Sequence, residues 1–151
     1  MRPALEQVCA GNHARLLLVG ARPETARLFN GTTPEVVAWS EVTEAAMIAR
    51  MDIGIMPLLD SPWERGKCGY KIIQYMACGL PVVASPVGVN VNIVHHGENG
   101  LLATDEAAWR DALERLIASP ALRERMGAAG RARVEAEYSL GAQVPRLADI
   151  L

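Results

Sequence analysis

The sequence lacks the features that mark several large classes of protein. Its lysines and arginines form no run and the formal net charge is −2, so the charge pattern does not favour nucleic acid as a partner. No apolar run reaches the ~18 residues that a membrane-spanning helix needs. The N-terminal residues Met1-Arg2-Pro3 lead into a mixed segment rather than the apolar core of a signal peptide. We therefore expect a soluble, cytoplasmic protein.

Cysteine is also scarce, and the three copies cannot all pair with one another. Cys9, Cys68 and Cys78 lack the spacing of metal ligands, which favours reduced thiols that pack as small apolar residues. His95 and His96 have no acidic or cysteine partner at ligand spacing, so we expect them at the surface. The sequence thus predicts neither a metal site nor a resident cofactor.

No linker, internal repeat or low-complexity tract divides the chain. Its 151 residues, half of them hydrophobic and 21% charged, fit one globular domain. A domain of this size buries roughly two-thirds of the surface of its unfolded chain. We expect a single domain over residues 1–151.

Short apolar runs alternate with helical patterns over the first 85 residues. The expected strands are residues 16–19, 35–39, 52–57 and 82–84. The expected helices are residues 4–10, 23–29, a segment that Thr43 caps and that runs to Met51, and a segment between Gly69 and Gly79, with a loop at 58–63. This alternation predicts an α/β fold with a Rossmann-like parallel sheet and helices on both of its faces.

Beyond residue 104 the chain becomes helical. Asp105 and Ser119 can each cap a helix, the second running to about residue 138, and Ser139 can cap a last one. The last helix carries Val144, Leu147 and Leu151. Gly127 and Gly130 lie inside the second of these helices, where a glycine costs about 1 kcal/mol relative to alanine, so we expect close packing there.

The stretch 64–85 has the strongest features of a functional site. Gly66 and Gly69 flank the start of a helix, whose unpaired N–H groups and positive dipole end suit a phosphate. Lys67, Lys71 and Gln74 fall within about 60° of one another on the helix surface. The apolar side of the helix holds Ile72, Ile73, Met76 and Ala77. The alternative is that the two lysines are only the solvated face of this helix.

In a parallel α/β fold, ligands bind at the carboxyl ends of the strands. The loops after Val19, Trp39, Met56 and Ala84 therefore form the expected mouth of the site, and the third of them leads into residues 64–85. Trp39 and Trp63 lie near this mouth and could stack on a base or a sugar. For an aromatic side chain at a strand end, however, a place in the core is the more common outcome.

Four segments carry a family resemblance through their order and spacing. They are residues 52–58, 69–85, 88–103 and 126–131. Together they resemble the C-terminal, donor-binding half of retaining glycosyltransferases of GT-B architecture, the family often called group 1 or family 4. In that family a Glu, a glycine-containing loop and a second Glu eight residues after the first hold sugar, diphosphate and ribose. Here Gly66 and Gln74 stand at the two acidic positions, and Lys67-Cys68-Gly69 stands at the loop.

The resemblance implies a function in retaining sugar transfer from a UDP-, GDP- or other nucleotide sugar. The acceptor would be a glycan, a lipid or a small molecule. The implied donor-binding residues are Glu64, Gly66, Lys67, Cys68, Gly69, Tyr70, Lys71 and Gln74. Among them, Lys67 and Lys71 would stabilise charge on the leaving diphosphate, and Glu64 would stand in for the missing first Glu.

The resemblance also implies missing parts. Neither an acceptor-binding N-terminal domain nor the first strand of the donor domain precedes Leu16, and the isolated chain is expected to be inactive. Peripheral membrane association would come through that missing domain. Other interpretations stay open: a non-catalytic module that binds a nucleotide or a partner protein, or a sugar-nucleotide epimerase or phosphorylase of the same architecture.

Overall fold

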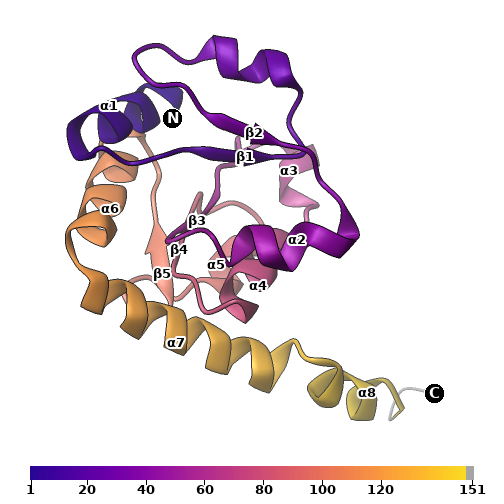
Figure 1. The fold of residues 1–151 in the computed structure, drawn as a ribbon. Helices are drawn as coiled ribbons and strands as arrows, with labels where there is room; N and C mark the ends of the chain where they lie inside the picture. Colours follow the sequence, from indigo (N-terminus) through magenta and orange to yellow (C-terminus); the bar gives the residue numbers. More distant parts are fainter. Residues whose placement is uncertain (149–151) are drawn as a thin grey trace.

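The computed structural model describes residues 1–148 (Figure 1). Strands and helices alternate along the chain as expected. In order they are α1 (Arg2–Asn12), β1 (Leu17–Val19), the 3-10 helix η1 (Pro23–Leu28), β2 (Glu35–Val37), α2 (Glu41–Ile48), β3 (Gly54–Met56), α3 (Pro62–Arg65), α4 (Tyr70–Ala77), β4 (Val82–Ala84), α5 (Asn90–Ile93), β5 (Gly100–Leu102), α6 (Glu106–Ala118), α7 (Pro120–Glu137) and α8 (Leu140–Ala148).

Every strand pairing is parallel, but the strands form two sheets rather than one. β1 pairs with β2, with Leu17 opposite Glu35. β4 lies between β3 and β5, and Val82 is opposite Gly54 on one side and Gly100 on the other. The α/β class is confirmed, whereas the single continuous sheet is not: within residues 1–148 no strand pairs with both β1 and β3.

Helices cover both faces of the three-stranded sheet. Val83 of β4 packs into a core with α1 and α6, whereas its neighbours Val82 and Ala84 pack into a second core with α4 and α5. All three of these side chains are fully buried. Because side chains alternate across a strand, β4 feeds both cores at once. In Figure 1, α1 and α6 lie side by side, and α7 runs beneath the sheet and contacts α4.

Side-chain caps account for where several helices begin. Asp105 Oδ1 accepts a hydrogen bond from Ala108 N at 2.9 Å, and Ser119 Oγ accepts one from Leu122 N at 3.2 Å, so both expected caps are confirmed. The cap of α2 is different: Ser40 Oγ accepts from Thr43 N at 3.2 Å. Thr43 is therefore inside the helix, because an equally good cap residue three positions earlier starts it first.

Two short helices, α3 and α5, lie outside the helices that the sequence predicted. α3 begins inside the expected loop 58–63, because Ser61 accepts a hydrogen bond from Glu64 N and Pro62 occupies the first turn. α5 occupies residues 90–93 before the turn that leads to β5. Along the chain, α3 lies between the carboxyl end of β3 and the start of α4, and it is therefore part of the candidate site.

The helix α7 packs closely on α4, as its two glycines predicted. A Cβ on Gly127 would lie 1.9 Å from Gly79 O, and one on Gly130 would lie 2.9 Å from Met76 Cγ. α8 follows, with Ser139 Oγ accepting from Ala142 N at 3.2 Å. The expected apolar residue Leu151 lies outside the described residues. Across residues 1–148, no helix combines the length and apolar character that crossing a membrane would require.

Candidate functional site

The N-terminus of α4 is closed on one side by the segment around α5. Gly69 caps α4 with a φ of 69°, and a Cβ there would lie 2.4 Å from Ile93 Cδ1. Gly69 has no side chain to cap the helix, so the N–H groups of Tyr70 and Lys71 have no side-chain cap, whereas Ile72 N donates to Gly69 O at 2.9 Å. Tyr70, the first residue of α4, is 59% exposed. A free helix N-terminus thus faces outward beside the carboxyl ends of β3 and β4, as an anion site requires.

One carboxylate, which the sequence analysis did not assign, binds three polar side chains beside this helix. Glu44 of α2 lies with Oε1 at 2.5 Å from Lys71 Nζ and 2.7 Å from Trp39 Nε1. Its Oε2 lies 2.5 Å from Gln74 Nε2. The side chain of Glu44 is only 16% exposed. The carboxylate therefore fixes one side of α4 to α2 and to the end of β2.

The contacts of Glu44 set its charge state. Hydrogen bonds from Lys71 and then Trp39 hold the pKa of Glu44 below its ordinary value, against a smaller opposing effect of burial, and Gln74 adds to the lowering. Burial, and next the negative charge of Glu44, raise the pKa of Tyr75. The carboxylate is thus ionised, and the tyrosine neutral, at neutral pH.

The polar ridge predicted on α4 divides into two ion pairs. Lys71 and Gln74 meet at Glu44, but Lys67 does not join them. Lys67 Nζ lies 2.7 Å from Glu64 Oε2 on α3 instead. Both lysines keep part of their surface in solvent, with side chains 41% exposed for Lys67 and 44% for Lys71. The two ammonium groups therefore flank the start of α4, each already paired with one carboxylate.

Of the remaining predicted residues, Gly69 is buried and the others lie on the surface. Gly66 ends α3 and is exposed, as is Cys68, which is a free thiol. Gly66 contributes only backbone at the position where the resembling family has a carboxylate. The nearest carboxylate in sequence is Glu64, and its place in the ion pair with Lys67 brings it to the same loop. The structure thus gathers the predicted residues of 64–74 around one helix end.

The loops after β3 and β4 support this helix end. Ser85 Oγ accepts a hydrogen bond from Leu58 N at 3.0 Å, which joins the two loops. Asn90, 1% exposed, donates from Nδ2 to Ser85 O at 3.0 Å. Gly88 has a φ of 56°, and a Cβ there would lie 2.6 Å from Arg65 O. The loop therefore packs directly on the end of α3, and its backbone conformation requires glycine.

Two tryptophans at the mouth are exposed, so their expected place in the core was wrong. Trp39 is 53% exposed and Trp63 is 82% exposed. Trp39 lies just beyond the last residue of β2, and its indole N–H is directed to Glu44. Trp63 lies on α3, a single turn of helix at the surface. The strands and loops at this edge are short, so neither hydrophobic core extends far enough to bury the two indole rings.

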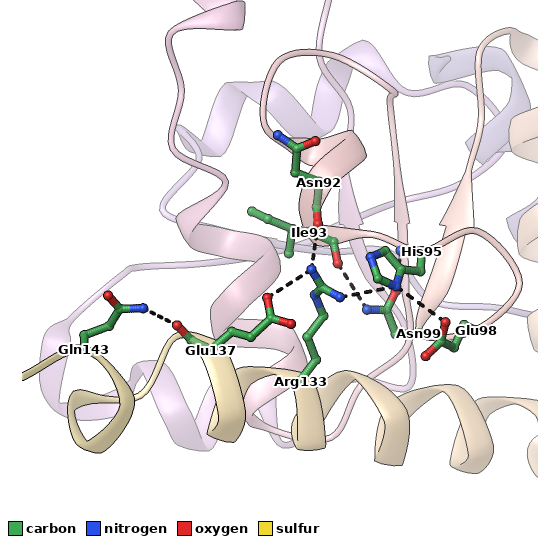
Figure 2. A network of polar contacts seen from close by, with 8 residues as sticks. All are labelled: Asn92, Ile93, His95, Glu98, Asn99, Arg133, Glu137 and Gln143. Atoms are coloured by element: carbon green, nitrogen blue, oxygen red, sulfur yellow. Dashed lines mark hydrogen bonds and ion pairs between the residues drawn. The ribbon is translucent and has the colours of Figure 1, made fainter. Parts of the chain in front are cut away.

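A separate network ties α5 and the following turn to α7 (Figure 2). Arg133 Nη2 donates to Asn92 O at 2.9 Å and pairs with Glu137 at 3.0 Å, while its Nη1 lies 3.2 Å from His95 Nδ1. Asn99 accepts from His95 N at 2.8 Å. In Figure 2 the side chain of Asn92 points away from this cluster. His95 is exposed, as expected, and its role here is to hold the turn before β5.

Glu44 is the one central residue of the site that sequence reasoning missed. The sequence pattern predicts that Glu44 lies in the first turn of a helix that follows a strand ending at the mouth of the site. It does not predict which side chains bond the Glu44 carboxylate. Lys71 lies 27 residues further along the chain. The two meet only in the tertiary structure, where the side chain of Glu44 reaches from α2 to α4. In residues 1–148, the structure contains no group of three or more His, Cys, Asp or Glu side chains arranged to hold a metal ion.

The fold and the site define an α/β domain in which a helix without a side-chain cap starts at the carboxyl edge of the parallel strands. Residues 2–119 match the family model described as glycosyl transferases group 1. The chain therefore belongs to the group 1 glycosyltransferases.

Two curated relatives illustrate the family match. The chain is 34% identical over 106 residues to a D-inositol 3-phosphate glycosyltransferase of Pseudarthrobacter chlorophenolicus, covering 69% of this chain and 22% of the relative. It is 31% identical over 157 residues to an alpha-D-kanosaminyltransferase of Streptomyces kanamyceticus, covering 97% of this chain and 39% of the relative. The chain thus spans well under half the length of these relatives.

Solved structures share the fold over nearly the whole chain. A sucrose-phosphate synthase of Thermosynechococcus elongatus matches with a TM-score of 0.75 and 25% identity, covering 99% of this chain and 41% of that one. HepE of Anabaena, solved in complex with UDP and glucose, matches with a TM-score of 0.77 and 20% identity, covering 98% of this chain and 42% of that one. The GT-B domain assignment is confirmed by these likenesses.

Proposed function

We propose that this chain is the donor-binding domain of a retaining glycosyltransferase and binds the diphosphate of a nucleotide sugar at the N-terminus of α4. The observation that carries the proposal is the uncapped helix start at Gly69 with Lys67 and Lys71 on either side of it. Membership of group 1 glycosyltransferases and the likeness to a structure that holds UDP and glucose support it.

The proposed chemistry is electrostatic. In sugar transfer, the bond from the anomeric carbon to the diphosphate breaks and negative charge grows on the leaving phosphate oxygens. The N–H groups at Gly69–Lys71 and the ammonium of Lys71 would stabilise that charge. Lys71 has three N–H donors, of which the contact to Glu44 uses one, so a phosphate oxygen can take another. Gln74 is fixed by Glu44 through its amide nitrogen, and its amide oxygen is buried without a hydrogen-bond partner; a ribose hydroxyl that reached this oxygen would supply the missing donor.

The other ion pair gives Glu64 a role in recognition of the sugar. Lys67 neutralises Glu64 at 2.7 Å in the absence of a donor. An arriving diphosphate would attract Lys67, and Glu64 would then be released to accept from a sugar hydroxyl. This exchange would place a carboxylate near the position that Gly66 leaves without one. The acceptor, a glycan, lipid or small molecule, would bind to parts of the protein beyond this domain.

Ligand binding to the chain tests the donor assignment. We would screen thermal stability with UDP, GDP, ADP and TDP and with their glucose conjugates. At a ligand concentration of 100 times Kd, binding to the folded state adds about 2.7 kcal/mol, which raises Tm by several degrees in a domain of this size. Stabilisation by at least one nucleotide, weakened by Lys71→Met, is the expected result. No stabilisation by any of them would overturn the proposal.

A non-catalytic nucleotide-binding module is the second candidate. Gly66 and Gln74 favour it, because neither supplies the carboxylate that the resembling family uses at these two positions. Sugar transfer assays on the protein that carries this domain distinguish the two candidates. A module of this kind would bind a nucleotide in the thermal screen, yet the protein that carries it would release no nucleoside diphosphate from the sugar donor.

A further inference from the structure

The side chain of Gln74 is hydrogen-bonded at one end only. Its Nε2 donates to Glu44 Oε2 at 2.5 Å, whereas its Oε1 is buried and has no hydrogen-bond partner in residues 1–148. A buried acceptor that lacks a donor costs free energy, so such an atom in a folded protein calls for an explanation. Lys71 and Trp39, the other two partners of Glu44, reach the same carboxylate from α4 and from the end of β2. The unpaired oxygen therefore belongs to the polar cluster that borders the start of α4.

The charge of Glu44 decides which end of the Gln74 amide faces it. An ionised carboxylate accepts hydrogen bonds and donates none, whereas an amide has an NH2 group at one end and an oxygen at the other. Gln74 can bond the Glu44 carboxylate only through its NH2 group, so its oxygen must point away from Glu44. The lowered pKa of Glu44, caused first by its bond from Lys71, keeps the carboxylate ionised at neutral pH.

Glu44 is itself held in one orientation. Lys71 Nζ and Trp39 Nε1 both bond its Oε1, at 2.5 Å and 2.7 Å, and Oε2 is left to Gln74. Trp39 in turn is packed on Gly20, since a Cβ on Gly20 would lie 3.1 Å from Trp39 Cβ. Three donors thus converge on one carboxylate whose side chain is only 16% exposed. A carboxylate held in this way cannot turn without losing a hydrogen bond, so the direction of the Gln74 oxygen is fixed as well.

There is space beside Gln74 for the hydroxyl group of a ligand. Gln74 lines a pocket of about 220 Å³ between α2 and α4, together with Ala45, Ala77 and Cys78. Along α4, Gln74 lies one turn beyond Tyr70, the first residue of the helix, which corresponds to about 6 Å along the helix axis. In a nucleotide the ribose follows the phosphates and carries hydroxyl groups, which are hydrogen-bond donors. A diphosphate at the start of α4 can therefore place the ribose beside Gln74.

We propose that Glu44 is a positioning residue for the nucleotide donor: it turns the amide oxygen of Gln74 toward the ribose, where this oxygen accepts a hydrogen bond from a ribose hydroxyl. The inference rests on the proposed function, because it takes the diphosphate to bind at the start of α4. The hydroxyl supplies the donor that Gln74 Oε1 lacks. The bond from the Gln74 NH2 group to a charged acceptor polarises the amide, which makes its oxygen a stronger acceptor. Glu44 thus acts on the ligand through Gln74 without touching it.

Exchanging the two side chains tests this role. In the double variant Glu44→Gln, Gln74→Glu the carboxylate and the amide change places, so their hydrogen bond is retained and α4 presents a carboxylate to the ribose. Gln74→Glu alone places two carboxylates in contact, and Glu44→Gln alone lets the Gln74 amide take either orientation. Glu41→Gln is the control, because Glu41 is an exposed acid on α2 that lines the same pocket.

The first measurement is the affinity for nucleotides with and without ribose hydroxyls. Calorimetric titration of the folded chain would use UDP, GDP and ADP, each beside its 2′,3′-dideoxy form, and inorganic pyrophosphate. The ratio of the two Kd values reports the ribose contact and not the stability of the fold, because both forms bind the same protein. We expect wild type and the Glu41 variant to prefer the hydroxylated form about fivefold or more. The single variants of Glu44 and Gln74 should lower this ratio toward one, and the double variant should restore at least the wild-type value, because a carboxylate is a stronger acceptor than an amide.

The second measurement needs only wild type and Glu44→Gln. In wild type, an NMR signal of the Gln74 side-chain NH2 group should be shifted downfield by its bond to the carboxylate, and this shift should be lost in the variant. Absence of the shift in wild type would overturn the inference. A dideoxy ratio near one in wild type, or the same ratio in every variant, would also overturn it, while pyrophosphate binding would still support the proposed diphosphate site. Failure of pyrophosphate and of all the nucleotides to bind would instead overturn the proposed function together with this inference.

Discussion

Glu44 and Lys71, 27 residues apart in the sequence, form an ion pair of 2.5 Å between α2 and α4. The pair lies next to the uncapped start of α4, where Trp39, just beyond β2, donates to the same carboxylate. It has two consequences. It holds the ammonium of Lys71 at the candidate site before a ligand arrives, and it links the geometry of that site to the placement of α2.

Lys71→Ala in the protein that carries this domain should lower kcat by about 100- to 1,000-fold, the usual loss when one charge-stabilising donor is removed from such a site. The measurement is release of nucleoside diphosphate from the sugar donor. Arg131→Ala is the matched control, because Arg131 is an exposed cation on α7 whose partner is Glu135 on the same helix. Near wild-type turnover by the Lys71 variant would refute the assignment of its role.

Glu44→Gln should make stability less sensitive to acid. The pKa of Glu44 is lower in the folded protein than its ordinary value of 4.5, so the ionised carboxylate stabilises the fold above that pH. This contribution is lost as the pH falls from about 4.5 through the lowered pKa of the folded state. Urea unfolding over a pH series should thus show a difference between wild type and variant that is largest near neutrality and shrinks in acid.

The matched variant for this experiment is Glu35→Gln. Glu35 is exposed at 44% of its side chain, and its partner Arg50 is also exposed, so this pair is solvent-screened. The Glu35 variant should track the wild type across the same pH series. A constant difference for Glu44→Gln from neutral pH down to acid would mean that its charge does not stabilise the fold.

How far the sequence predicted this structure depends on the range of each interaction. Asp105 and Ser119 were recognised as caps because a cap and its helix lie within four residues of each other. The strand 82–84 was recognised because a short run of buried apolar residues between Pro81 and Ser85 has few other structures available. Local chemistry fixed these elements.

The features that escaped prediction depend on tertiary packing. No local pattern distinguishes Glu44 from the other acids of α2, and its partners come from α4 and from the end of β2. Ala77 lies at the edge of the apolar side of α4, about 140° around the helix from Ile72, and it is exposed whereas Ile72 and Met76 are fully buried. Helical periodicity predicts the side of the helix on which each side chain lies. It does not predict which neighbouring element packs against that side chain.

Gly69→Ala should destabilise the fold more than Gly79→Ala does. Both glycines have left-handed backbones, with φ of 69° and 74°, so alanine costs about 1–2 kcal/mol at each from backbone strain. A Cβ at Gly79 has nothing within 4 Å, whereas one at Gly69 meets Ile93 Cδ1 at 2.4 Å, and Ile93 is only 3% exposed. Overpacking of this kind adds about 1–3 kcal/mol. Equal free energies of unfolding for the two variants would show that α5 does not close the start of α4.

Gly127→Ala tests the contact between α7 and the end of α4. In an isolated helix this change would gain about 1 kcal/mol, since alanine is the better helix former. Here the new Cβ would lie 1.9 Å from the carbonyl oxygen of Gly79, a backbone atom that cannot turn aside, so α7 must move away from α4. We expect a net loss of about 2–3 kcal/mol in the free energy of unfolding. Gly11→Ala in α1, where a Cβ has nothing within 4 Å, should instead be neutral or slightly stabilising. A Gly127 variant as stable as the Gly11 variant would show that the two helices do not make this contact in solution.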